Sequence, residues 1–156
     1  MGIFHRSRDS SNIEMIPAHT VRDAASALSK SIPQWDNFTK GFYKDWGDNK
    51  CAPDEIDMKL WDVQTGSDVI IGMLIRKRQL IQKELKGDAL TKEIKKNVDE
   101  IAGFRDRVVD FARKAKEMKR YDAAMNLFDD AAILTRAIHQ DDTVYLKEIH
   151  ELEDKV

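Results

Sequence analysis

The sequence has little of what builds loops, disulfides or membrane spans. It contains 3 prolines, 7 glycines and 1 cysteine in 156 residues. Because so few residues interrupt helices, long continuous helices are possible. The lone cysteine, Cys51, excludes an internal disulfide and favours the cytoplasm or another reducing compartment. No apolar run approaches the roughly 20 residues of a transmembrane helix, and the opening residues lack the apolar stretch of a secretory signal.

Signatures of catalysis and ligand binding are also missing. The sequence has no phosphate-binding loop, Gly-rich dinucleotide turn or nucleophile elbow. His139, Asp141, Asp142 and His150 lie close enough along the chain to be considered as metal ligands, but surface residues near a helix junction explain them as well. We therefore expect no enzymatic activity, no cofactor, no metal and no small-molecule substrate.

What the sequence does contain is charge of both signs and a large apolar share. Charged residues make up 35% and hydrophobic residues 42%, and the formal net charge is -2. This apolar share is sufficient for a packed core, and the balanced charge creates no global attraction to nucleic acid or anionic membranes. We expect a flexible tail over residues 1–16 and a single helical domain over residues 17–156, with halves 17–87 and 88–156.

Apolar residues recur at helical spacing through most of the chain. This periodicity predicts an all-α fold, an antiparallel bundle of five to seven helices with a long heptad-patterned hairpin. Thr20 followed by Asp23 resembles a capping box at the start of the first helix. Pro33 is expected to end or kink that helix, and residues 65–67 are expected to form a break or a weak point in a later one.

An aromatic stripe runs along residues 35–46. Its members follow one another at helical steps and therefore share one face of a helix: Trp35, Phe38, Phe42 and Trp46. Such a stripe is either core or a partner-binding face, because aromatic residues dominate both. The next helix, opening near residue 53, is expected to have an inner face made of Ile56, Leu60, Trp61 and Val63.

The strongest periodicity lies between Leu90 and Met118. Its members alternate steps of four and three, which is the pattern of a heptad seam, and Asn97 is its one polar member. The seam must be covered, either by the chain's own helices or by a second copy. The residues expected to form this bundle or oligomer seam are Ile94, Asn97, Ile101, Phe104, Val108 and Phe111.

Small and aromatic residues at hairpin spacing occur at Ala112, Tyr121, Ala124, Phe128 and Ala131. Over about residues 105–138 this spacing resembles a tetratricopeptide-type hairpin, in which small residues let two antiparallel helices approach closely. Val108 and Arg136 stand where that family has Trp and Pro, and a solenoid needs several repeats where this chain has one. Residues 88–156 are also similar to a three-helix domain of the microtubule-interacting and trafficking type. Any closely packed hairpin needs such small residues, so neither family is assigned.

These features predict a protein that binds other proteins through apolar helical surfaces, as an adaptor, chaperone-like or assembly subunit. An alternative is a self-assembling structural subunit joined through the heptad seam. A third is a nucleic-acid-binding accessory factor that uses the basic clusters within residues 76–78, 92–96 and 113–120. Acidic residues interleave with these clusters, so we expect a protein partner or self-association rather than nucleic acid.

Overall fold

The computed structural model describes residues 13–156, so most of the tail expected over residues 1–16 lies outside the described part. The described helices are α2 (Val21–Gly47), α3 (Pro53–Glu84), α4 (Gly87–Glu117), α5 (Tyr121–Ala137) and α6 (Thr143–Glu153). Residues 13–156 contain no strand, which confirms the all-α class. The expected number of five to seven helices refers to the whole chain and stays a prediction.

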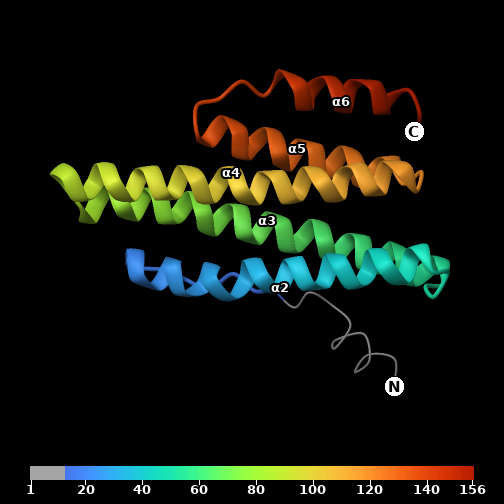
Figure 1. The fold of residues 1–156 in the computed structure, drawn as a ribbon, viewed down its shortest axis with the longest axis horizontal. Coiled ribbons are helices and arrows are strands. Elements are labelled where there is room, and N and C mark those ends of the chain that lie inside the picture. The colour runs from blue at the N-terminus through green and yellow to red at the C-terminus, as the bar shows by residue number, and fades with distance from the viewer. Residues whose placement is uncertain (1–12) are drawn as a thin grey trace.

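The five helices lie side by side and run alternately up and down (Figure 1). In this view α3 and α4 occupy the middle, α2 lies below them, and α5 and then α6 lie above. Short links after α2, α3 and α4 make consecutive helices antiparallel neighbours. Contacts also join α3 to α5, which run in the same direction. None of the helices in the described range is long and apolar enough to cross a membrane.

Local signals in the sequence set several helix ends. The hydroxyl of Thr20 accepts a hydrogen bond from the amide N–H of Asp23 at 3.1 Å and caps α2, as expected. Three helices are followed by a residue with left-handed backbone geometry. This geometry lets the amide groups after the helix donate hydrogen bonds to its last carbonyl groups. The residue with positive φ lies two positions after α2, α4 and α5, respectively: Asn49 (58°), Lys119 (63°) and His139 (57°).

Neither of the two expected helix ends occurs, whereas a kink at Pro33 and a weak point at residues 65–67 stay predictions. Pro33 lies inside α2 and does not end it, although its ring nitrogen cannot donate a helical hydrogen bond. Gly66 and Ser67 lie inside α3, where both are buried. In both places tertiary packing outweighs local helix propensity, since buried side chains flank each position along the helix.

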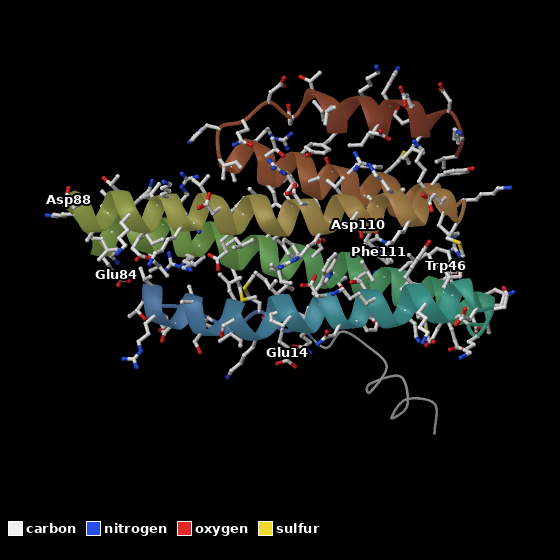
Figure 2. The ribbon with its side chains drawn as sticks, in the orientation of Figure 1. Glu14, Trp46, Glu84, Asp88, Asp110 and Phe111 are labelled. Carbon is white, nitrogen blue, oxygen red and sulfur yellow. The ribbon has the colours of Figure 1, made fainter. Side chains whose placement is uncertain are left out.

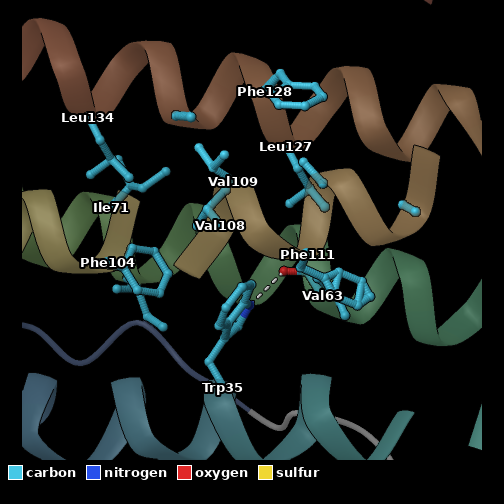
Figure 3. Packing of buried hydrophobic residues seen from close by; sticks show 14 of the residues in the cluster. Trp35, Val63, Ile71, Phe104, Val108, Val109, Phe111, Leu127, Phe128 and Leu134 are labelled. Carbon is cyan, nitrogen blue, oxygen red and sulfur yellow. Dashed lines mark hydrogen bonds between the residues drawn. The ribbon is translucent and has the colours of Figure 1, made fainter. Parts of the chain in front are cut away.

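Aromatic rings from α2 and α4 form the centre of the core (Figure 3). Trp35 is 1% exposed and donates its indole N–H to the carbonyl of Val63 on α3 at 3.0 Å. Its ring meets the edge of Phe104 with a centroid separation of 5.1 Å. Two turns further along each helix, Phe42 stacks on Phe111 with a centroid separation of 5.9 Å. These contacts join α2, α3 and α4 around one apolar centre.

The heptad seam of α4 faces inward. Ile94 is half-buried, and the other five seam residues are buried: Asn97, Ile101, Phe104, Val108 and Phe111. The Asn97 side chain donates to the carbonyl of Leu74 on α3 at 3.3 Å, and its Oδ1 has no hydrogen-bond partner within residues 13–156. The seam thus contacts the chain's own helices, and its pairing with a second copy stays a prediction.

Candidate interaction site

The aromatic stripe of α2 lies within the chain's own packing. Trp35, Phe42 and Trp46 are buried, and Phe38 is half-buried. Phe42 stacks on Trp46 with a centroid separation of 5.3 Å. Figure 2 shows Trp46 near the end of α2 and Phe111 on α4, between the two helices. This burial favours the core alternative, and partner binding by these four residues stays a prediction.

The third tryptophan has the opposite environment. Trp61 on α3 is 65% exposed, whereas Leu60 and Val63 on either side of it are buried. The expectation that Trp61 belongs to the inner face of this helix is therefore wrong. Successive residues of an α-helix are about 100° apart around its axis, so the residue after Leu60 points away from the neighbours that cover Leu60.

Trp61 borders a surface hollow of about 420 Å³, where α4 turns into α5. The lining comes from α3, the α4–α5 turn, the start of α5 and the last residues of the chain, and includes Leu60, Trp61, Gln64, Arg120, Tyr121 and Lys155. This surface is referred to below as the Trp61 hollow. Segments far apart in the sequence build it, which is why spacing along the chain did not reveal it.

The walls of the Trp61 hollow are held together by polar bonds between helices. Arg120 of the α4–α5 turn pairs with Asp57 of α3. Asn126 of α5 donates a side-chain N–H to Gln64 of α3 at 2.7 Å. Leu60 is buried between these two bonds and gives the hollow an apolar base. Such a preformed surface loses little conformational entropy when a partner binds.

The exposed groups around the Trp61 hollow combine apolar rings with positive charge. The Lys155 ammonium lies over the ring of Tyr121, 5.5 Å from its centroid. Apart from the pair of Arg120 with Asp57, the rim carries Lys119 and Lys155 against one further acid, Asp122. Trp, Tyr and Arg are the residue types most enriched at the energetic centres of protein interfaces, and all three line this hollow.

A second surface, the α2–α4 groove, runs between those two helices. It consists of two hollows of about 350 and 440 Å³ that share Arg107. Its charges largely pair with one another, since Arg107 meets Asp36 at 3.3 Å and Lys114 meets Asp110 at 3.0 Å. None of the large apolar side chains that line the groove is strongly exposed to solvent. The groove therefore offers a partner less apolar area than the Trp61 hollow.

The basic cluster at residues 76–78 is used inside the fold. Arg76 donates to a carbonyl of the segment before α2 at 3.3 Å. Lys77 pairs with Glu100 of α4 at 2.9 Å, and Arg78 donates to the last carbonyl of α5. The three cations thus contact three different elements of the fold.

The group considered for a metal has other roles in the structure. Asp141 accepts a hydrogen bond from the amide N–H of Thr143 at 3.0 Å, and the Thr143 hydroxyl and this N–H hold the pKa of Asp141 below its usual value. Asp142 pairs with Arg136 at 2.6 Å. Within the described part of the chain, no three metal-ligating side chains gather at one point.

Fold and surface together define a class: an all-α antiparallel bundle with a preformed hollow that exposes a tryptophan. Comparison with known proteins adds no relative, because no family model, no curated protein and no solved structure matches the chain. The tetratricopeptide-type and trafficking-type resemblances therefore rest on residue spacing alone. Function has to be argued from the residues of this chain.

Proposed function

We propose that this protein is a non-enzymatic interaction module, an adaptor, chaperone-like or assembly subunit, that binds a segment of a partner protein in the Trp61 hollow. The observation that carries the proposal is the 65% exposure of Trp61 at the rim of a hollow with an apolar base. Covering the exposed part of this indole is worth on the order of 3 kcal/mol. Large apolar groups exposed beside polar ones typically mark interaction sites.

The chemistry of the hollow indicates which segment fits. An apolar or aromatic side chain fits between the Trp61 indole and the base at Leu60. A carboxylate beside that side chain meets Lys119 and Lys155, which outnumber Asp122, the acid of the rim that is not paired with Arg120. The proposed occupant is therefore a partner segment with an apolar anchor flanked by acidic residues.

The test is the affinity of one identified partner for three purified versions of the full chain. Nuclease-treated lysate supplies the candidate, and its dissociation constant is then measured with wild type, Trp61→Ala and Lys40→Ala. Lys40 is exposed in the α2–α4 groove and serves as the matched control. We expect Trp61→Ala to weaken binding at least about tenfold and Lys40→Ala to leave it unchanged.

Three outcomes would overturn the proposal. Binding that depends on Lys40 and not on Trp61 would move the site to the α2–α4 groove. Capture that disappears with nuclease would favour the nucleic-acid alternative. A wild-type oligomer that dissociates on Trp61→Ala, seen by sedimentation, would place a second copy in the hollow and favour self-assembly.

A further inference from the structure

The contact between α3 and α5 buries a carboxyl group beside a second carboxyl group. Asp130 on α5 is 7% exposed and accepts a hydrogen bond from the hydroxyl of Ser67, which is fully buried on α3, at 2.8 Å. Asp68, the next residue on α3, is exposed to solvent and acts on the carboxyl group of Asp130, whose pKa it raises. In the sequence, Asp130 stands out only as the neighbour of Asp129 on the same helix, where the two side chains point apart.

Within residues 13–156, no cation pairs with this carboxyl group. The charged groups that act on Asp130 are Asp68 from α3 and Asp129 from α5 itself. Lys116 of α4 pairs with Glu148 of α6 at 3.2 Å, and neither acts on the pKa of Asp130. The charges that the described residues place on this site are therefore negative, in contrast to an ordinary buried ion pair.

Two carboxyl groups in this setting are most stable when they share one proton. Burial first, and then the adjacent Asp68, raise the pKa of Asp130 to about 8, whereas the Ser67 hydrogen bond acts in the opposite direction. In its protonated form Asp130 donates to the Asp68 carboxylate and accepts from Ser67. After loss of the proton, a negative charge is buried in the helix interface at Asp130, beside the exposed side chain of Asp68.

We propose that the Asp68–Asp130 pair makes the packing of α5 on α3 depend on a bound proton, so that deprotonation loosens α5 from α3. The bond between Gln64 and Asn126, which holds one wall of the Trp61 hollow, lies one helical turn away. Protonation therefore also affects the geometry of that wall. This second consequence rests on the proposed function, and the experiment below measures the helix contact alone.

The sign of the pH effect follows from proton linkage. Asp130 titrates near its usual value of 3.8 when unfolded and at about 8 when folded. Between these values the folded chain holds a proton that the unfolded chain has released, so the stability from the shared proton is complete at the acid end and is lost as the pH rises toward 8.

The experiment is urea unfolding of the full chain, followed by circular dichroism from about pH 6 to about pH 9. The variants are wild type, Asp130→Asn and the matched control Asp129→Asn, whose side chain is exposed one position away. We expect the wild-type urea midpoint to fall with rising pH and the Asp129→Asn midpoint to fall nearly as much, because Asp129 is the weakest of the groups that act on Asp130. Asp130→Asn mimics the protonated form, so its midpoint should stay level and exceed that of wild type at the alkaline end.

A wild-type profile that runs parallel to that of Asp130→Asn would overturn the proposal. Asp68→Asn gives a second test, because removing the neighbouring group should lower the pKa of Asp130 and end the fall of the urea midpoint at a lower pH. If Asp130→Asn does not fold, carbon-13 NMR of labelled aspartate in wild type decides. A buried aspartate that titrates near pH 8 supports the proton-sharing pair, and titration of all aspartates near pH 4 contradicts it.

Discussion

Trp35 and Trp61 lie on neighbouring helices, and yet one is 1% and the other 65% exposed. Trp35 points into the angle between α3 and α4, where it bonds to Val63 and meets Phe104. Trp61 precedes Val63 by two residues and points away from the same core. The difference shows that residue type and local spacing do not separate a core ring from an interface ring. The two kinds of ring are separated by the position of the helices that cover one of them and leave the other exposed.

The largest effect should come from removing the enclosed ring. Trp35→Ala deletes a fully packed indole, its hydrogen bond to Val63 and its contact with Phe104. Truncations of this kind cost about 3–5 kcal/mol, so the urea midpoint should fall sharply. A loss below about 1 kcal/mol would mean that Trp35 contributes no more to the free energy of unfolding than an exposed residue does.

A smaller effect, of opposite sign, should come from the one polar member of the buried seam. Asn97 has an unpartnered Oδ1 and donates one long bond, to Leu74. Asn97→Leu removes the buried carbonyl and is expected to raise the free energy of unfolding by about 1 kcal/mol. Thermal unfolding measures this change. If the variant is destabilised, the added side-chain volume outweighs the relief of the polar group.

Truncation of the exposed ring should leave stability nearly unchanged. Trp61→Ala removes a side chain that is 65% exposed to solvent. The free energy of unfolding should therefore stay within about 0.5 kcal/mol of wild type. Urea unfolding beside Trp35→Ala provides the comparison. A large loss of stability would show that the chain itself needs Trp61 and would remove the basis of the proposed partner site.

Fluorescence can sharpen the contrast without disturbing the fold. Trp61 should be accessible to acrylamide, and Trp35 and Trp46 should not, because they are 1% and 7% exposed. Trp61→Phe should therefore shift the emission to shorter wavelength and remove most of the quenching. Strong residual quenching in this variant would indicate that the buried rings are reached by solvent.

Helix positions could largely be read from the sequence, and the site could not. The Thr20 cap, the turn near Lys119 and the inward face of the α4 seam follow from local spacing. The outward position of Trp61 and the meeting of Asp130 with Asp68 depend on how separate helices pack against one another. Local spacing gives the face of each helix but not which helix covers it.

The parallel pairing of α3 with α5 has a kinetic consequence. The bond from Ser67 to Asp130 joins residues 63 positions apart, whereas consecutive helices meet through short links. Contacts of large sequence separation form late, because the intervening chain must be ordered first. A contact absent from the folding transition state alters the rate of unfolding and leaves the rate of folding nearly constant. Deprotonation of the Asp68–Asp130 pair should therefore shorten the lifetime of the folded chain without slowing its formation.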